Sequence, residues 1–366
     1  MNTELNRWSD VGRTSAAIWA EHRLLLFIAF VYVAAGGAWL WLQHQPWHFH
    51  LAYQRPWILW LILTSGWVIL TYMLHPRLVK PIFRPERVLG ALLVASLVAP
   101  VQSTFQSLKR GIPAFLWDDW LSRIDVALHR VPPWTLWLPG EPVMRFIDFT
   151  YIRGWFMSVG MFVVWLSWTS RRELRTRALV STILVWILGG SVLAWAFSSA
   201  GPCYYDRIVA GDNPYSALTA RIEAQKLFAG DAQRVLWGLR TDGIVTPTSG
   251  ISAMPSMHVT MGVLMAIVMW HRSRAIGLIL ALYAGLVQIG SVVLGWHYAI
   301  DGYVGAGVAA FCWWGAGWLC HGEKHPRQSA QAESITESSL PGPSKGRVMR
   351  SLVKTPPATD TLVDKV

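Results

Sequence analysis

The sequence predicts an all-α polytopic membrane protein with about eight transmembrane helices and an amphipathic helix on the outer interface. Of the 366 residues, 53% are hydrophobic and only 14% are charged, whereas roughly 25% of the residues in an ordinary soluble domain are charged. The chain also contains 23 Trp residues, and Trp is enriched at both membrane–water interfaces. Apolar runs long enough to cross a bilayer recur along the chain and set the number of helices.

Eight apolar runs are the expected spans. They cover residues 24–42, 57–74, 88–105, 154–168, 178–197, 255–270, 275–294 and 299–319. The segment before them, 1–23, is polar and mixed in charge, and the first run is too long for a cleavable signal peptide. Residues 322–366 are rich in Ser, Pro, Thr and charged residues, a composition that predicts a disordered tail. We therefore expect an N-terminal segment, a membrane domain over 24–321 and a tail.

The basic residues predict the orientation of the spans, because cytoplasmic loops are enriched in Lys and Arg. Three loops on one side of the expected topology are basic, and they carry Arg77, Lys80, Arg84 and Arg87, then Arg171, Arg172, Arg175 and Arg177, and finally Arg272 and Arg274. With an even number of spans, both termini lie on this cytoplasmic side. The start of the sixth span and the junction of the seventh and eighth then lie at the extracytoplasmic face of a plasma or bacterial inner membrane.

The net charge of +11 does not predict nucleic-acid binding, because its carriers lie mainly in short loops and in the tail beside apolar spans. We attribute the charge to topology and to attraction by anionic lipids. The three cysteines, Cys203, Cys312 and Cys320, lack CxxC spacing and predict neither a disulfide framework nor a metal knot. We expect no redox chemistry and no cofactor.

Residues 115–130 predict the amphipathic helix. Two stripes lie opposite each other at helical spacing. The apolar stripe consists of Trp117, Leu121, Ile124 and Leu128, and the polar stripe consists of Asp118, Ser122, Asp125 and His129. Such a helix lies on the membrane interface with its apolar face toward the lipid. Asp118 and Asp119 look like a carboxylate pair, but we interpret them as part of a solvated face.

His297 and Asp301 form the first candidate catalytic pair. They lie four residues apart, so in a helix both side chains emerge on one face. The carboxylate accepts from one ring nitrogen, which fixes the tautomer and leaves the other nitrogen free as a base or nucleophile. The alternative is a structural pair that closes a helix end. At membrane depth an ionisable pair is costly unless it faces a water-filled cavity or a ligand, which favours catalysis.

The segment Pro255-Ser-Met-His258 is the second candidate site. Pro255 is suited to open a helix, whose free N–H groups would form with the Ser256 hydroxyl a site for an anion such as phosphate. His258 would then donate a proton to a leaving oxygen while His297 attacks phosphorus. The alternative is a helix cap with a surface histidine. Both clusters are expected at one membrane level, which favours a single phosphate-transfer site.

Arg207 is a candidate for stabilising negative charge on a phosphoryl group, because it follows the fifth span at the same outer level. Lys226, Arg234 and Arg240 in the same loop are its rivals, and an interfacial arginine near lipid headgroups is the alternative. We expect no metal, because the remaining histidines show no His-x3-His spacing on a helix.

These residues resemble the type-2 phosphatidate phosphatase superfamily of lipid phosphatases and phosphotransferases, and most closely its inositol phosphorylceramide synthase branch. Ala253-Met-Pro-Ser-Met-His258 is similar to the family's Pro-Ser-x-His block, and His297-Tyr-Ala-Ile-Asp301 is similar to its His-x3-Asp block. The resemblance implies a core of six spans, here the last six, and a catalytic function for the membrane domain.

The resemblance also implies the roles of individual residues. His297 would be the nucleophile that forms a phosphohistidine, Asp301 would orient it, His258 would protonate the leaving group and Ser256 would bind phosphate. The phosphatases carry a basic Lys-x6-Arg-Pro block where this chain has Gly201-Pro-Cys-Tyr-Tyr-Asp-Arg207. Arg207 is thus an inferred substitute for that block.

A second departure from the phosphatases lies at Ser291, where they have an arginine six residues before the nucleophile. Both departures resemble the synthase branch, whose substrate is a phosphodiester with less charge to neutralise. We therefore expect a phosphotransferase that takes a phospholipid or lipid phosphate as donor and an alcohol as acceptor. With water as acceptor, the same residues would make a lipid phosphatase. A proton-coupled transporter and an inactive membrane scaffold are the alternatives from other classes.

Overall fold

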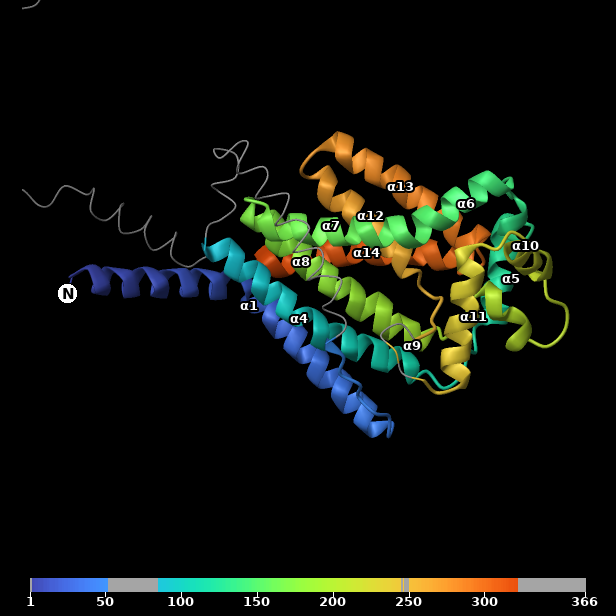
Figure 1. Ribbon diagram of the computed structural model, residues 1–366, viewed down its shortest axis with the longest axis horizontal. Coiled ribbons are helices and arrows are strands. Elements are labelled where there is room, and N and C mark those ends of the chain that lie inside the picture. Colours follow the sequence, from blue (N-terminus) through green and yellow to red (C-terminus); the bar gives the residue numbers. More distant parts are fainter. Residues whose placement is uncertain (1, 52–84, 245, 247–249, 322–366) are drawn as a thin grey trace, which may run out of the picture. The chain divides into compact units, whose positions relative to one another are not determined.

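The computed structural model describes residues 2–51, 85–244, 246 and 250–321, and all regular structure within these ranges is helical (Figure 1). Six helical stretches are long and apolar enough to cross a membrane, which indicates an integral membrane protein. They are Ile18–Leu42, Leu89–Arg110, Glu141–Leu166, Arg172–Ala196, Arg274–Val293 and Ala299–His321.

The expected number of eight spans is thereby corrected to six among the described residues. The expected span 57–74 and the tail 322–366 lie outside the described ranges. The expected span 255–270 is α12 (Met257–Trp270), which has 14 residues. At 1.5 Å per residue it is about 21 Å long, shorter than the roughly 30 Å hydrocarbon core. It is short because residues 251–256, including Pro255, precede it as non-helical chain.

The other helices follow the sequence in order. They are α1 (Asn2–Leu42), α4 (Pro85–Arg110), α5 (Asp118–His129), α6 (Glu141–Phe149), α7 (Trp155–Trp168), α8 (Arg172–Ile187), α9 (Ala194–Ala196), α10 (Ser216–Ala224), α11 (Phe228–Thr241), α13 (Arg274–Val293) and α14 (Ala299–His321). Two π-helical turns, Thr150–Gly154 and Leu188–Leu193, join α6 to α7 and α8 to α9. Helix α1 continues without a break through the polar residues before the first expected span.

Helix α12 packs against α13 and α14, and α14 also packs against α8 (Figure 1). The core between these helices is apolar; fully buried members are Val185, Met261, Leu264, Val268 and Ala309. Two glycines permit close approach. A Cβ at Gly262 would lie 3.2 Å from the Ala284 Cβ, and one at Gly305 would lie 2.8 Å from the Ser256 carbonyl oxygen. Small residues at helix contacts allow such backbone proximity in membrane proteins.

Helix α5 confirms the expected helix, but the prediction of a solvated acidic face is wrong for Asp118. Its side chain is buried, as are those of Ser122 and Asp125, whereas Trp120 and Leu128 are exposed. The acidic stripe therefore faces the protein. Asp119 does lie at the surface, where it pairs with Arg123.

The buried carboxylates of α5 bind backbone N–H groups. Asp125 accepts from the N–H groups of Ala299 and Ile300, at 2.6 and 2.9 Å, and so caps the start of α14. Asp118 accepts from the N–H groups of Ala200 and Gly201. Burial raises the pKa of both carboxyls, and the N–H donors partly offset this by favouring the charged form.

We expect Asp125→Ala to lower the free energy of unfolding by about 2 kcal/mol, because two N–H groups at the start of α14 lose a charged acceptor. Arg123→Ala on the same helix is the matched control, since it removes only an exposed pair with Asp119 worth less than about 1 kcal/mol. Thermal unfolding of the purified protein in detergent measures both. Equal effects of the two changes would contradict the capping role.

Candidate active site

His297 lies in the turn between α13 and α14, at the expected junction of two spans, so it does not share a helix with Asp301. The Ser291 carbonyl accepts the N–H groups of Trp296 and His297, both at 3.0 Å, and Gly295 adopts a φ of +69° that the turn requires. Asp301 lies in the first turn of α14. The imidazole and the carboxylate nevertheless meet, with Nδ1 of His297 3.4 Å from Oδ2 of Asp301.

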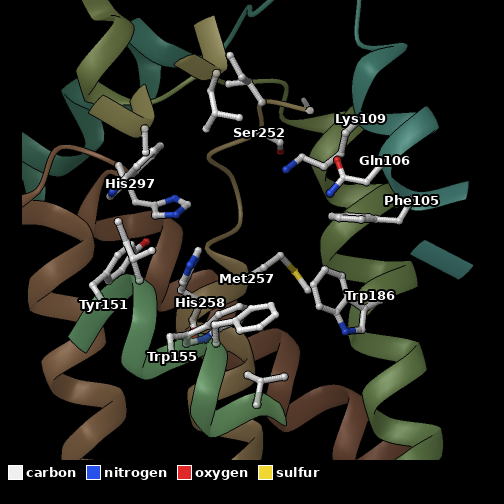
Figure 2. A pocket seen from close by; sticks show the side chains of 18 of the residues that line it. Phe105, Gln106, Lys109, Tyr151, Trp155, Trp186, Ser252, Met257, His258 and His297 are labelled. Atoms are coloured by element: carbon white, nitrogen blue, oxygen red, sulfur yellow. The ribbon is translucent and has the colours of Figure 1, made fainter. Parts of the chain in front are cut away.

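The tautomer of His297 follows from its nearest neighbour. Nδ1 lies 2.7 Å from the carbonyl oxygen of Ala253, and a carbonyl can only accept a hydrogen bond, so Nδ1 carries the proton. Nε2 therefore holds a free lone pair, and the imidazole points into a cavity (Figure 2). Asp301 is fully buried beside the ring and also accepts the N–H of Tyr298 at 3.0 Å. The Ala253 carbonyl and Asp301 thus fix the tautomer of His297 together, whereas the sequence predicts this role for Asp301 alone.

His258, in the first turn of α12, faces the same cavity (Figure 2). Its ring stacks on Tyr151 at a centroid distance of 4.5 Å and contacts Trp155 at 4.3 Å. The indole N–H of Trp155 donates to the His258 carbonyl, which holds the start of α12 against α7. The ring centroids of His258 and His297 are 6.4 Å apart. The structure therefore brings together the two imidazoles that the sequence analysis singled out.

Ser256 is the N-cap residue of α12 and is fully buried. Its N–H donates to the Asp301 carbonyl at 3.0 Å, which joins the starts of α12 and α14. Its hydroxyl lies close to that of Tyr151, yet within the described residues neither hydroxyl makes a hydrogen bond of good geometry. Ser256 is not among the residues that line the cavity.

The cavity has a volume of about 520 Å³. Aromatic and aliphatic side chains make up most of its wall, and they include Phe105, Trp155, Phe156, Val159, Trp186 and Leu236. Besides the histidines, polar side chains come mainly from one face of α4: Gln102, Gln106 and Lys109. Such a mostly apolar pocket with a few polar groups suits a ligand that carries both hydrocarbon and a charged group.

The structure does not bring Arg207 to this cavity. Its side chain is exposed and its guanidinium lies over the Trp237 ring, 5.1 Å from the centroid. The three rivals also lie elsewhere: Lys226 is exposed, Arg234 pairs with Glu223 and Asp231, and Arg240 donates to the Ile112 carbonyl. No group of His, Cys, Asp and Glu side chains in the described ranges is arranged to hold a metal ion.

Sequence analysis missed Lys109, the lysine that lines the cavity. It lies near the end of α4, outside the loop in which a basic residue was sought. A signal was present, because Gln102, Gln106 and Lys109 recur at helical spacing directly after a mostly apolar run that ends at residue 101. Such a polar stripe in a membrane helix indicates a face turned toward the protein interior.

The segment 201–207 supports the His297 turn. The Cys203 N–H donates to the Gly295 carbonyl at 2.9 Å, and the Ala253 N–H donates to the Ser199 carbonyl at 2.8 Å. Gly201 has a φ of +101°, and a Cβ there would lie 2.4 Å from the Trp296 carbonyl oxygen. The chain thus fits between the two histidine-bearing segments only because residue 201 has no side chain.

We expect Gly201→Ala to destabilise the protein more than Gly211→Ala. Both glycines have a φ near +100°, but a Cβ at Gly211 would meet nothing within 4 Å. The control therefore carries only the backbone strain, about 1 to 3 kcal/mol, whereas Gly201→Ala adds a collision with the Trp296 carbonyl. The difference in thermal unfolding midpoint in detergent measures the collision, and identical midpoints would contradict it.

Comparison with known proteins identifies the family of this chain. Residues 119–315 match the model of the PAP2 superfamily, and the matched region contains Ser256, His258, His297 and Asp301. Searches of curated proteins and of solved structures found no match. Because the matched region covers more than half of the 366 residues, the chain belongs to the PAP2 superfamily.

Proposed function

We propose that this protein transfers the phosphorus-containing group of a membrane lipid through a covalent intermediate on His297. Membership of the PAP2 superfamily implies an activity of the lipid phosphatase or phosphotransferase type. The observation that carries the proposal is the pair of imidazoles at one cavity: His297 has its Nδ1 proton bound by the Ala253 carbonyl, and His258 lies 6.4 Å away between ring centroids.

In the first step, Nε2 of His297 attacks phosphorus, the P–N bond forms and the bond to the leaving oxygen breaks. His258 gives its proton to that oxygen. In the second step, the acceptor hydroxyl attacks phosphorus and gives its proton to His258, and the P–N bond breaks. The Nδ1 proton stays on His297 throughout, and Asp301 stabilises the positive charge that the ring acquires.

Ser256 and the start of α12 support binding of the transferred group. The first N–H groups of a helix have no partner within it and attract an anion, and the Ser256 hydroxyl beside them has no hydrogen-bond partner in the described part of the chain. Because Ser256 is fully buried and the residues Met257 and His258 line the cavity, we assign the more direct contact to the N–H groups of these two residues. Arg207 has no part in this proposal.

We further propose a phosphodiester lipid as donor and an alcohol as acceptor, as in an inositol phosphorylceramide synthase. No arginine lines the cavity in the described residues, and Ser291 serves to hold the His297 turn. Besides the proton on His258, the described wall therefore offers a single cation, Lys109, as expected for a donor with little charge to neutralise. Water as acceptor would instead make the protein a lipid phosphatase.

We expect His297→Ala to lower turnover about a thousandfold or more, because no nucleophile remains. His258→Ala should slow turnover by roughly a hundredfold or more, through loss of proton transfer. His271→Ala, at the exposed far end of α12, is the matched control and should keep full activity. The assay incubates purified protein with phospholipid labelled at phosphorus.

The same assay identifies the intermediate and the acceptor. Label that stays on the denatured wild-type protein, survives alkali and is lost in acid indicates a phosphohistidine, and His297→Ala should abolish it. A new labelled lipid indicates an alcohol acceptor, whereas free phosphate or a free phosphorylated headgroup indicates water. Full turnover in His297→Ala would refute the proposed enzyme and leave a membrane scaffold.

The proposed site lies at the extracytoplasmic face, and single cysteines test this placement. In a background without Cys203, Cys312 and Cys320, we expect Asp212→Cys to react with an impermeant maleimide on intact cells. Arg272→Cys, in the turn between α12 and α13, should react only after permeabilisation. Both positions are exposed, so accessibility does not bias the result. Labelling in the reverse order would place the site at the cytoplasmic face.

A further inference from the structure

Lys109 is a charged side chain of the cavity wall, and none of the described residues provides a counterion for it. Among the described lining residues there is no Asp, Glu or Arg. Lys109 contacts the Phe105 ring, with Nζ 5.2 Å from the centroid, and its ammonium makes no hydrogen bond or ion pair within the part of the chain that the structure describes. A cation held in apolar surroundings without a partner is costly. The cavity therefore favours an anionic occupant.

The Lys109 ammonium faces the two histidines across the cavity. Figure 2 shows Gln106 and Lys109 extending from α4 into the cavity, with His258 and His297 extending from the opposite side. Lys109 and His258 are close enough for their charges to interact. An anion between the two walls would thus meet the ammonium on one side and the imidazoles on the other.

The neighbouring chain holds Lys109 in this orientation. Gly250 packs against the base of the side chain, because a Cβ at residue 250 would lie 2.7 Å from the Lys109 Cβ and 2.9 Å from Oε1 of Gln106. The segment that continues from Gly250 through Ser252 and Ala253 reaches the carbonyl that binds His297. One stretch of chain therefore touches both the lysine and the nucleophile.

We infer that Lys109 binds the phosphate oxygens of the lipid substrate and is the cation that the loop residues near Arg207 do not provide. The inference rests on the proposed function for the identity of the ligand, a lipid phosphate ester. Lys109 would neutralise negative charge on the non-bridging oxygens, while His297 attacks phosphorus from the facing wall. The hydrocarbon tails of the lipid would lie along the aromatic wall that includes Phe105, Trp155 and Trp186.

Binding to two short-chain lipids in detergent tests this role. Dioctanoyl phosphatidylglycerol carries the phosphate, and dioctanoylglycerol has the same tails without it. Measurements in the His297→Ala background exclude turnover. We expect Lys109→Met to raise the Kd of the phospholipid at least tenfold and to change that of dioctanoylglycerol less than twofold. Lys109→Arg should restore phospholipid binding to within about threefold, because it keeps the charge.

Arg207→Met is the matched control, because it removes an exposed cation outside the cavity. An unchanged phospholipid Kd in Lys109→Met would overturn the inference, as would an equal loss for both lipids, which would indicate packing alone. The thermal midpoint of Lys109→Met should not fall, since a buried unpaired charge is replaced by an apolar chain of similar size.

The outcomes separate this inference from the proposed function. A tenfold loss of phospholipid binding in Lys109→Met without any phosphohistidine in the wild-type protein would support Lys109 and refute the proposed chemistry. A phosphohistidine on His297 with no effect of Lys109→Met on binding would support the chemistry and refute the role of Lys109. In the full protein, kcat/KM should fall by at least tenfold in Lys109→Met and change less than twofold in Arg207→Met.

Discussion

The contact between the starts of α12 and α14 is the constraint on which the site depends. The Ser256 N–H donates to the Asp301 carbonyl at 3.0 Å, and Gly305 lets the helices approach until a Cβ would lie 2.8 Å from the Ser256 carbonyl. This contact brings His258, in the first turn of α12, toward His297, which lies just before α14. Two imidazoles about forty residues apart in sequence thus meet because two helix starts share a backbone hydrogen bond.

Buried polar groups at this place are tolerated because backbone donors and acceptors pair with them. The carboxylate of Asp125 caps α14, and that of Asp118 accepts N–H groups from the 200–201 segment and the Tyr298 hydroxyl. On the other side, the Ser291 and Ala253 carbonyls bind the main chain and ring of His297. His297 is thereby held from both sides, which is the preorganisation that its proposed role as nucleophile requires.

Local spacing explains what could be predicted from the sequence. His297 with Asp301, and Ser256 with His258, are separated by so few residues that almost any compact arrangement keeps them close, and hydropathy located most of the helices. Asp118 was misjudged because a polar stripe on an amphipathic helix is compatible with water or with buried N–H groups. Whether Asp118 faces water or buried N–H groups depends on residues 200–201, which lie some eighty residues away in the sequence. Lys109 was missed for the same reason, because α4 meets the histidines only through tertiary packing.

The same packing explains why the number of spans was overestimated. Hydropathy treats 255–270 as one run, but residues 251–256 leave the helix so that the Ala253 carbonyl can reach His297 and the Ser256 N–H can reach Asp301. The helix that remains, α12, has 14 residues and is therefore not among the six long apolar helices. Its first two residues, Met257 and His258, line the cavity. The helix start beside the cavity has free N–H groups of the kind that attract an anion.

The charges of the cavity also limit the donor. A single lysine faces the two imidazoles, and no acidic residue or arginine lines the described wall. Lys109 can balance one negative charge of a bound phosphate ester, and the proton that the proposed mechanism places on His258 can balance a second. Negative charge beyond these two would be costly, because desolvation of an ion is repaid only by an opposite charge or hydrogen bonds. The electrostatics of the described wall therefore favour a ligand that carries one or two negative charges.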